Sequence, residues 1–576
     1  MRALKALAAL LFLNAALSFD NWWPTPAVQP DHRLAPEFVV LWVILLVAAK
    51  RWGEPPRRLT TGLALGYLLL VIGRYLDVTA PALFGRPINL YWDVGQIPRF
   101  LSVAAQHLES WQLAGIAVLV VLLLWGLFSL LRLAIDIAGR QAAPVALRST
   151  AALGVTAVAV ALAVANAAGV EATWPIVARP VTPTYARQAD LLVSALSPAR
   201  LEAALPPSPA FDSDLAALRG ADVTLIFLES YGATVFDNPA SRERLTPARD
   251  ALAKAIAASG HQVVSAFVTS PTFGGASDMA HLGLLSGIDL SDPLRHDLLL
   301  TTGRRTLLDL FRARGYETFG FYPALSWDWP ERRFYAFDRF LDGPGLGYRG
   351  PHFGLWWIPD QYAIARFAEL NPIGPETPPR FLLFPTINSH IPFQPVPPYQ
   401  PDWARVLSEQ PFDDAEVANA LADRIDWTDL PPAYRRTIEY TYTWLAGYLR
   451  QPYPRDRLLI LIGDHQPAGS VTGPGAPWDV PVHVMSGNAE LLQRLEALGF
   501  HPGLEPKRPV LGPMHHLTQI LLDAFDGSVE TESLARRETS HGISMAFAGT
   551  PTPALPGPRP IGSTVGLSAA EGATPK

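Results

Sequence analysis

The chain of 576 residues contains no cysteine. Disulfide bonds and thiolate metal sites are therefore both excluded, which suits an oxidising compartment without requiring one. Charged residues are also scarce, at 17% of the chain. A net charge of -6 gives no electrostatic reason to expect a nucleic-acid partner.

Apolar sequence is what the chain has in excess. Hydrophobic residues make up 49% and the mean hydropathy is +0.16, which is too apolar for an ordinary soluble protein. Five apolar stretches lie near the start, at roughly 4–19, 36–49, 60–80, 113–137 and 149–170. The last three match the length of about 20 residues with which a helix crosses a bilayer. The first resembles a signal peptide, but a second stretch follows so closely that we interpret it as an uncleaved helix. Residues 1–175 are thus predicted to form a transmembrane domain of five helices.

The charges of the loops predict the orientation of this domain. Basic residues gather in alternate loops: Arg2 and Lys5 before the first stretch, Lys50, Arg51, Arg57 and Arg58 after the second, and Arg140 and Arg148 after the fourth. Basic loops of membrane proteins lie preferentially in the cytoplasm. Five crossings from a cytoplasmic N-terminus leave the rest of the chain outside. We therefore expect a multi-pass protein of the inner (cytoplasmic) membrane with a periplasmic or extracellular C-terminal domain.

The remainder divides into three segments. Residues 176–217 mix prolines with short amphipathic pieces and are predicted to be a linker with helices on the membrane surface. Residues 541–576 are rich in Pro, Gly, Ala, Ser and Thr and are predicted to be a disordered tail. Between them, in 218–540, strand-like runs alternate with helical patterns. The runs are 222–230, 262–268, 316–322, 380–386 and 457–463. This alternation predicts an α/β fold with a mainly parallel sheet covered by helices on both faces.

Polar residues stand where three of these strands end. The first strand ends in Glu229, within "IFLES", and "LLILIGDH" ends in Asp464 and His465. The loop "TFGGAS" leads from another strand to Ser277 at the start of an apolar helix. Ligands of open α/β sheets gather at the carboxyl ends of the strands. Taken alone, Ser277 could be a helix N-cap. Together the four side chains form an oxygen and nitrogen set that suits Mn²⁺, Mg²⁺ or Zn²⁺, and a metal would activate the serine hydroxyl for attack on phosphorus or sulfur.

The motifs "LES", "GGAS" and "GDH" resemble those of the alkaline phosphatase–sulfatase superfamily over residues 220–525. With five helices ahead of an external domain, the whole plan resembles the lipoteichoic acid synthase and phosphoglycerol transferase branch. The resemblance implies that Glu229, Ser277, Asp464 and His465 bind one divalent metal, foremost Mn²⁺, and that Ser277 is the nucleophile. The branch more often has Thr in place of Ser277 and an acidic residue in place of His281. Because His281 replaces this acidic residue, the resemblance leaves open which residues contact the acceptor.

Substrate-binding residues also follow from the resemblance. His390 in "TINSHIPF" takes the place of a histidine that contacts the substrate phosphate. The segment 321–342 resembles the part of these enzymes that holds the glycerophosphate head group. One of Trp327 and Trp329, with one of Arg332 and Arg333, would serve there, and the other tryptophan would pack in the core. His281 completes the set of expected substrate contacts. His483 is either a neighbour of the metal ligands or simply buried.

The resemblance implies a metal-dependent phosphotransferase. Its donor would be a phospholipid, foremost phosphatidylglycerol, and its acceptor a hydroxyl of a glycan or lipid, with a phospho-Ser277 intermediate. One alternative is transfer of phosphoethanolamine, although members of that branch commonly carry disulfides. Another is a hydrolase, although "SDMAH" lacks the Pro and Arg of the sulfatase signature that follows the modified residue. The last alternative is a catalytically degenerate membrane sensor or assembly protein.

Overall fold

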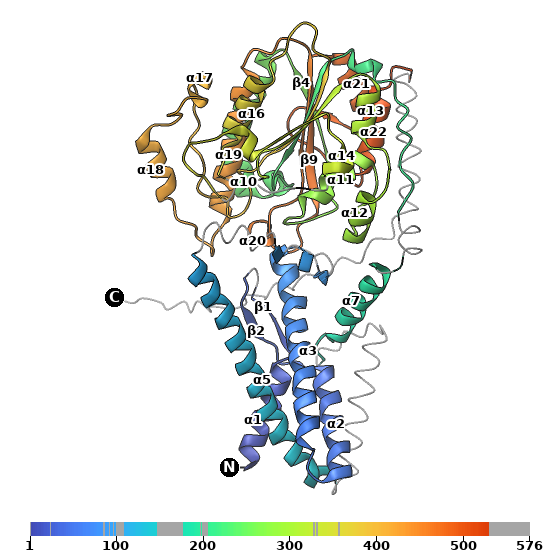
Figure 1. Cartoon of the computed structure of the whole chain (residues 1–576), viewed down its shortest axis with the longest axis vertical. Coiled ribbons are helices and arrows are strands. Elements are labelled where there is room, and N and C mark those ends of the chain that lie inside the picture. Colours follow the sequence, from blue (N-terminus) through green and yellow to red (C-terminus); the bar gives the residue numbers. More distant parts are fainter. Residues whose placement is uncertain are drawn as a thin grey trace, which may run out of the picture.

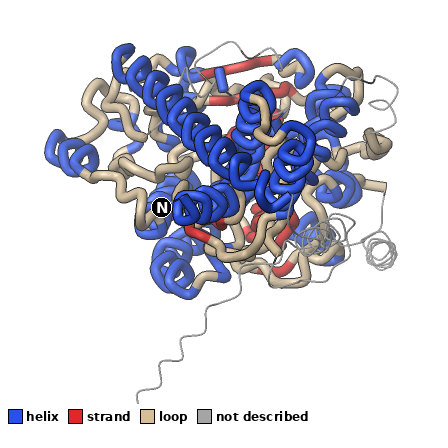
Figure 2. Tube along the Cα trace, turned by 90° about the horizontal axis from the view of Figure 1, so that it is seen from below, coloured by secondary structure: helices blue, strands red, loops and turns tan. Residues whose placement is uncertain are grey.

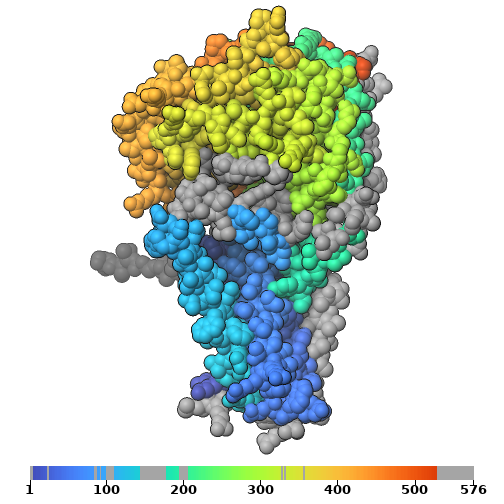
Figure 3. All heavy atoms as spheres, in the orientation of Figure 1, coloured from blue at the N-terminus to red at the C-terminus, as the bar shows by residue number. Residues whose placement is uncertain are grey.

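The computed structural model shows a helical stalk that carries a wider α/β domain (Figures 1 and 3). It describes residues 2–528, except for 23–24, 85–86, 91–92, 96, 99–108, 147–176, 196, 198–204, 326–328, 330–331 and 355–356. Figure 2 looks at the molecule from below, with the helices of the stalk in front of the α/β domain. The predicted tail, 541–576, lies outside the described residues.

Four helices build the described part of the stalk. They are α1 (Arg2–Ala15), α2 (Pro36–Trp52), α3 (Arg57–Phe84) and α5 (Ser110–Ala146), with a hairpin of β1 (Phe19–Asn21) and β2 (Val28–Pro30) after α1. α5 contacts the other three helices. Large apolar side chains from Ile116 to Trp125 are nevertheless exposed along α5, as expected for a surface that faces lipid.

Two of the five predicted spans meet the requirements for crossing a membrane. By length and composition, Arg57–Leu83 and Ser110–Ala142 are long and apolar enough, whereas the apolar helix Leu4–Ala15 is shorter. The fifth apolar stretch, 149–170, falls outside the described residues. The number of five transmembrane helices therefore stays a prediction.

The topology can be tested with reporter fusions. Because the basic residues alternate between loops, we expect the chain after α5 to lie outside the cytoplasm. A reporter that is active only in the periplasm should be active when fused after residue 215 and inactive after residue 55. The reverse pattern would place the α/β domain in the cytoplasm and would remove its access to an external acceptor.

The linker contains one described α-helix, α7 (Thr182–Ala195), and the short 3-10 helix η1 (Ala216–Leu218). α7 is docked to the stalk at its first turn. Oε1 of Glu37, on α2, accepts hydrogen bonds from the backbone N–H groups of Val181 (2.5 Å) and Thr182 (3.0 Å). The ring of Tyr185 packs against Gly73 of α3. A Cβ at this position would lie only 2.4 Å from the ring, so a larger residue would clash with it. The predicted helix in the linker is thus present, while its position on a membrane surface stays a prediction.

An eight-stranded sheet forms the centre of the α/β domain, in the order β10-β4-β9-β8-β3-β7-β5-β6. The strands are β3 (Asp222–Leu228), β4 (Gln262–Thr269), β5 (Glu317–Tyr322), β6 (Arg339–Asp342), β7 (Arg380–Pro385), β8 (Arg457–Gly463), β9 (Asp479–Ser486) and β10 (His501–Pro502). In this sheet only β9 and β10 are antiparallel to the other six strands, which all run in the same direction. The predicted α/β fold with a mainly parallel sheet is therefore confirmed, and all five predicted strands are present.

Helices cover both faces of the sheet. The first face carries α11 (Ser277–Ser286), α12 (Pro293–Leu300), α13 (Leu307–Ala313), α21 (Ala489–Ala497) and α22 (His516–Phe525). The second carries α10 (Pro239–Ala258), α16 (Asp360–Leu370) and α19 (Pro431–Leu449). The other described helices of this domain are α9 (Thr234–Asp237), α14 (Arg332–Tyr335), α15 (Gly343–Leu346), α17 (Trp403–Val406), α18 (Asp414–Ala422) and α20 (Gly469–Thr472). Alternate residues of β3 supply the two cores, because successive side chains of a strand point to opposite faces.

The carboxyl end of the central strands faces the stalk. β8 runs toward it, and α20, five residues after Asp464, contacts α3 (Figure 1). Residues at the ends of β3 and β8 therefore lie on the side of the domain that is turned toward the stalk helices.

Candidate active site

Glu229, Asp464 and His465 come together because β3 and β8 are neighbours in register, with Leu228 opposite Gly463. Each residue follows the end of its strand, and their potential ligand atoms all lie within 4.8 Å of one another. Nε2 of His465 is 3.5 Å from Oε1 of Glu229 and 3.6 Å from Oδ2 of Asp464. We call these three residues the metal set. The structure thus places side by side the three ligands expected from two distant parts of the sequence.

Ser277 points into the metal set. Its Oγ lies 3.3 Å from Oε2 of Glu229 and 3.3 Å from Nε2 of His465. It is the first residue of α11, and the N-cap position belongs to Ala276, which has a left-handed backbone (φ 61°). Gly274 and Gly275 before it also have positive φ, so the loop turns sharply and presents the serine hydroxyl to the carboxylates. The hydroxyl of Ser277 is therefore not a helix cap.

Neighbouring hydroxyl groups in the same loop are engaged elsewhere. Thr272 donates its hydroxyl hydrogen to the carbonyl oxygen of Gly275 at 2.5 Å. Ser270 donates to the carbonyl oxygen of Asp464 at 2.6 Å. Thr272 therefore supports the loop and Ser270 supports the backbone of Asp464, and Ser277 is the hydroxyl of this loop that faces the ligand atoms of the metal set.

Backbone groups hold the carboxylates in place. Oδ1 of Asp464 accepts hydrogen bonds from the N–H groups of Ser230 (2.8 Å) and His465 (2.7 Å), which leaves Oδ2 toward the imidazole. The hydroxyl of Ser230 donates to Oε1 of Glu229 at 2.9 Å. Gly463 is required before Asp464, because a Cβ there would lie 1.8 Å from the carbonyl oxygen of Tyr231. The two strand ends are thus packed directly against each other.

His465 presents the correct nitrogen for a metal. Its Nδ1 lies 2.8 Å from the carbonyl oxygen of Gln466, which can only accept, so Nδ1 carries the hydrogen. Nε2 is then left with its lone pair toward Glu229, Asp464 and Ser277. A second hydrogen bond that fixes the tautomer in this way is usual for metal-binding histidines.

The electrostatics of the metal set favour a bound cation. Burial, and next the charge of Glu229, raise the pKa of Asp464 to about 6. Burial alone would lower the pKa of His465, but the charges of Asp464 and Glu229 outweigh it and raise that pKa. Two buried carboxylates without a cation repel each other, and their oxygens with an imidazole nitrogen are typical ligands of divalent metals. The residues present therefore fit a divalent metal.

These pKa shifts predict a pH dependence. Below pH 6 a proton competes with the metal for Asp464, so we expect the affinity for Mn²⁺ to fall by about tenfold per pH unit. Because the pKa of Asp464 is raised, its contribution to stability is present below pH 3.8 and lost as the pH rises through about 6. Asp464 should therefore lower the melting temperature of the metal-free protein at pH 7.5 relative to pH 5, while buried histidines with a lowered pKa, such as His281, act in the opposite direction.

Thermal melting of the metal-free protein at the two pH values checks this, with Asp464→Asn as the control. From pH 5 to 7.5 the melting temperature should rise more, or fall less, in the variant than in wild type, because the variant has no carboxyl to ionise at this position. An equal change in both proteins would contradict the assignment of the shift to Asp464.

His390 lies on the loop that follows β7, beside the metal set. The hydroxyl of the preceding Ser389 donates to the carbonyl oxygen of Glu229 at 2.7 Å. Nδ1 of His390 lies 2.7 Å from the carbonyl oxygen of Ile391. Burial, helped by the charge of His465, lowers the pKa of His390. The predicted phosphate-binding histidine is thus neutral and next to the metal set.

Sequence analysis missed Asp360, which shapes the loop that carries His390. This residue opens α16, and its carboxylate accepts hydrogen bonds from the N–H groups of Ile387 (2.9 Å) and Asn388 (3.1 Å). Burial raises the pKa of Asp360 to about 7, and the charge of Glu229 adds to the rise. Nothing in the sequence around Asp360 signals this contact. Ser389 could have been noticed, since it adjoins His390 in a polar strand end.

The tryptophan and arginine segment is only partly placed. Trp327 lies outside the described residues. Trp329 is buried, with its ring 4.8 Å from that of Tyr322 and 5.2 Å from that of Tyr335. It therefore packs in the core. Arg332 and Arg333 are exposed on α14, and neither forms an ion pair with a described residue. Their contact with substrate stays a prediction.

Two further histidines are buried in the α/β domain. His281, one helical turn beyond Ser277, packs on Phe227 with 4.3 Å between ring centroids. Burial lowers the pKa of His281 to about 4. His483 is bonded on both sides, with Nε2 3.1 Å from the hydroxyl of Tyr231 and Nδ1 2.6 Å from that of Ser265. His483 is thus a fully satisfied core residue.

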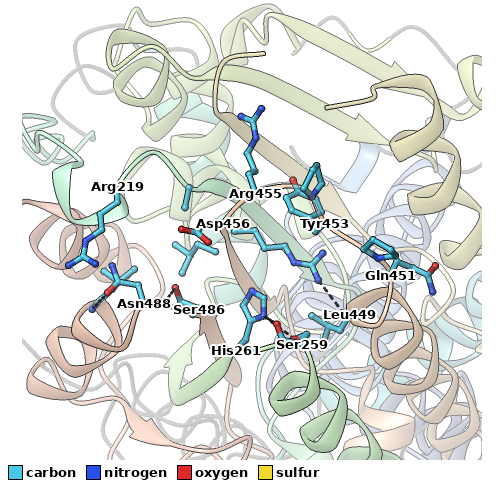
Figure 4. Close-up of a pocket in the computed structure, with 18 of the residues that line it drawn as sticks. Arg219, Ser259, His261, Leu449, Gln451, Tyr453, Arg455, Asp456, Ser486 and Asn488 are labelled. Carbon is cyan, nitrogen blue, oxygen red and sulfur yellow. Dashed lines mark hydrogen bonds between the residues drawn. The ribbon is translucent and has the colours of Figure 1, made fainter. Parts of the chain in front are cut away.

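A cavity of about 870 Å³ lies at the other end of the sheet (Figure 4). It opens at the amino ends of β3 and β8, and Arg219, His261 and Arg455 are among its lining residues. No residue of the metal set lines it. The metal set and Ser277 lie at the carboxyl ends of these strands. The candidate active site is therefore not in this cavity.

Comparisons with known proteins give matches among solved structures only. No family model matches the chain, and no curated protein matches it in sequence. A protein of the alkaline phosphatase superfamily from Vibrio parahaemolyticus is 17% identical, with 54% of this chain and 72% of that one covered and a TM-score of 0.33. The lipoteichoic acid synthase LtaP from Listeria monocytogenes is 14% identical, with 48% and 68% covered and a TM-score of 0.30.

The phosphoglycerol transferase GacH from Streptococcus pyogenes, in complex with sn-glycerol-1-phosphate, is 15% identical, with 56% of this chain and 79% of that one covered and a TM-score of 0.34. These identities and TM-scores are low. The solved structures to which the chain is similar include an alkaline phosphatase superfamily member, a lipoteichoic acid synthase, a phosphoglycerol transferase and a phosphoethanolamine transferase.

Proposed function

We propose that the protein is a membrane-anchored, metal-dependent phosphotransferase. It moves a phosphoglycerol-type head group from a phospholipid, foremost phosphatidylglycerol, to a hydroxyl of a glycan or lipid outside the cytoplasm. One observation carries the proposal: Oγ of Ser277 lies 3.3 Å from ligand atoms of both Glu229 and His465, at the first residue of a helix. A hydroxyl placed among metal ligands is the arrangement of an activated nucleophile.

Glu229, Asp464, His465 and Ser277 would hold one divalent metal, with Mn²⁺ the first choice. When bound, the metal supplies positive charge that stabilises the alkoxide of Ser277 and the developing charge on phosphorus oxygens. The metal set positions Ser277, and the first turn of α11 offers N–H groups to the phosphoryl oxygens. His390 lies where it can contact the phosphate from the loop after β7.

The reaction has two displacements at phosphorus. In the first, Oγ of Ser277 forms a bond to phosphorus as the bond to the diacylglycerol oxygen breaks, and the leaving oxygen takes up a proton. In the second, the acceptor hydroxyl forms a bond to phosphorus as the bond to Ser277 breaks, and Oγ regains a proton. The products are diacylglycerol and the substituted acceptor.

The position of the site favours a lipid donor. α20 follows the metal set by a few residues and contacts α3, which is long and apolar enough to span a bilayer. The head group of a membrane lipid is therefore the nearest source of a phosphodiester. Four convergent ligand atoms also favour an enzyme over a catalytically degenerate relative, which has no need to keep them together.

The experiment uses the purified full-length chain in detergent with Mn²⁺ and phosphatidylglycerol. We expect release of diacylglycerol, detected by mass spectrometry, and its loss on chelation of the metal. Lipids and glycans from cells with and without the protein should then differ by a glycerophosphate substituent. Release of glycerophosphate into solution would identify a hydrolase. Absence of diacylglycerol with every phospholipid tried would contradict the proposal.

A further inference from the structure

Arg457 is a buried arginine that forms no ion pair with a described residue. It begins β8, at the end of the sheet opposite to the metal set, and is 4% exposed. Its guanidinium lies over the rings of Tyr448 and Tyr453, 5.1 and 4.7 Å from the ring centroids. Burial raises the pKa of both phenols, so neither supplies a negative charge. Nε and Nη1 of Arg457 have no hydrogen-bond partner, and Nη2 lies 3.5 Å from the carbonyl oxygen of Leu449.

Two other buried arginines of this domain are bonded much more closely. Arg380 donates a hydrogen bond to the carbonyl oxygen of Asn371 at 2.7 Å. Arg494 donates to the carbonyl oxygen of Asp526 at 2.6 Å. Buried charges are normally paired or strongly hydrogen-bonded, because an unpaired charge loses its hydration without compensation. Arg457 departs from this rule.

The carboxylate opposite Arg457 is already engaged. Asp222 is its partner in the register of β3 and β8. Its Oδ2 accepts a hydrogen bond from the hydroxyl of Tyr453 at 2.7 Å, and its Oδ1 lies 3.4 Å from Nη1 of Arg455. The counter-charge of Arg457 must therefore come from another source.

The cavity of about 870 Å³ at the amino ends of β3 and β8 adjoins this charge. Arg457 is one of four arginines among its lining residues, and Asp456 is the single acidic residue among them (Figure 4). Burial, and next the charge of Arg457, lower the pKa of His261 on the same lining. A cleft lined by charges of one sign attracts ions of the opposite sign. An anion in this cavity supplies the counter-charge that Arg457 lacks.

The position and lining of the cavity indicate which anion fits. Since the carboxyl ends of the strands face the stalk, the cavity opens on the side remote from it, where a ligand arrives from water rather than from a bilayer. Ser259, Gln451, Ser486 and Asn488 are uncharged lining residues with hydrogen-bonding side chains (Figure 4). Such groups suit the hydroxyls of a sugar. Pockets of about 300–1,000 Å³ hold ligands larger than a phosphate ion. A phosphate offers arginines more charge and more acceptor oxygens than a carboxylate does.

We propose that this cavity is a second binding site of the protein, for a water-soluble sugar phosphate whose phosphate group is the counter-charge of Arg457. The seven residues of β3 separate it from the metal set by about 23 Å, at roughly 3.3 Å per residue, so a ligand bound there does not reach Ser277. The inference goes beyond the proposed function and does not depend on it, because binding at this site requires neither the metal nor turnover.

The test is titration calorimetry of the metal-free, full-length protein in detergent at constant ionic strength. We expect one equivalent of glucose 1-phosphate to bind, at least about tenfold more tightly than D-glucuronate, because the phosphate carries more charge than the carboxylate. Inorganic phosphate should bind more weakly than glucose 1-phosphate, since it lacks the hydroxyls of the sugar. Equal affinity for D-glucuronate, or tighter binding of inorganic phosphate, would overturn the assignment to a sugar phosphate.

Variants of two arginines on the lining locate the ligand. Arg457→Met should weaken the binding of glucose 1-phosphate by at least about a hundredfold, because the buried charge is removed. Arg457→Lys keeps the charge but loses the planar guanidinium that stacks on the tyrosines, and should weaken binding about tenfold. Arg450 lines the same cavity but is exposed, so Arg450→Met should change the affinity by no more than about threefold. Asp464→Ala should bind like wild type. If it does not, the sugar phosphate binds at the metal set and the inference is wrong.

Melting temperatures separate a binding role of Arg457 from a structural one. Without ligand, Arg457→Met should melt at the temperature of wild type or higher, because a buried charge without a counter-charge is removed. Saturating glucose 1-phosphate should raise the melting temperature of wild type but not that of Arg457→Met. A merely structural arginine would give a variant that melts lower and binds as tightly as wild type. Should Arg457→Met fail to fold, equal affinity in wild type, Arg457→Lys and Arg450→Met would overturn the inference, as would absence of binding to wild type.

Discussion

Ser277→Ala should abolish turnover, with a loss of at least about a thousandfold in kcat, because it removes the hydroxyl that forms the covalent bond to phosphorus. The hydroxyl that is removed lies 3.3 Å from Oε2 of Glu229 and 3.3 Å from Nε2 of His465. The fold should be retained, since Ser277 makes no helix cap and is partly exposed. Loss of one potential ligand should weaken metal binding but not eliminate it.

The measurement is peptide mass spectrometry after incubation with a lipid donor and no acceptor. It should find a glycerophosphate adduct on the peptide that contains Ser277, or a phosphate if the enzyme is a hydrolase. Ser277→Thr keeps the hydroxyl and matches the residue more common in the branch that the motifs resemble. It should therefore retain measurable activity and carry the adduct at the same position.

Thr272→Val is the control from the same loop. Thr272 already donates its hydrogen to the carbonyl oxygen of Gly275, so its loss should disturb the loop but spare the chemistry. We expect a decrease in kcat of no more than about tenfold. An adduct on Thr272, or full activity in Ser277→Ala, would refute the assignment of the nucleophile.

The metal set could be predicted from sequence because its geometry follows from strand pairing. Glu229 and Asp464 each stand directly after a fully buried strand, and carboxyl ends of parallel neighbours meet at one edge of the sheet. The rule that ligand-binding residues follow the carboxyl ends of buried strands needs only the local sequence. Applied to each of these two strands, it brings together residues that are more than two hundred positions apart. The role of Ser277 was predicted from the family resemblance, together with the glycines before it, which adopt positive φ in the structure.

Contacts that depend on tertiary packing could not be predicted. Asp360 holds the loop of His390 through two backbone N–H groups, and such a bond leaves no pattern near Asp360 in the sequence. Trp329 is oriented into the core by Tyr322 and Tyr335, which come from different elements. β9 was missed as a strand although all its residues are buried, because its antiparallel direction breaks the alternation of strands and helices.

Asp464→Ala or His465→Ala should reduce the affinity for Mn²⁺ by at least about a thousandfold, well beyond the 10- to 100-fold typical of outer-shell changes. Each variant removes a ligand atom from a set in which all ligand atoms lie within 4.8 Å of one another. The full-length protein should still fold. In the metal-free state Asp464→Ala should even melt at a higher temperature at pH 7.5, since the repulsion between the carboxylates of Asp464 and Glu229 is removed.

Two further variants serve as references when the affinity for Mn²⁺ is measured by titration calorimetry. Ser230→Ala removes the hydroxyl that donates to Oε1 of Glu229 at 2.9 Å, and should weaken Mn²⁺ binding by about 10- to 100-fold. His261→Ala changes a histidine at the opposite end of the sheet, beside the cavity of about 870 Å³, and should leave the affinity unchanged. If Asp464→Ala and His465→Ala bind one equivalent of Mn²⁺ as tightly as His261→Ala does, the metal is held elsewhere. Ser277 would then lose the means of its activation, and the proposed transfer would have no chemical basis.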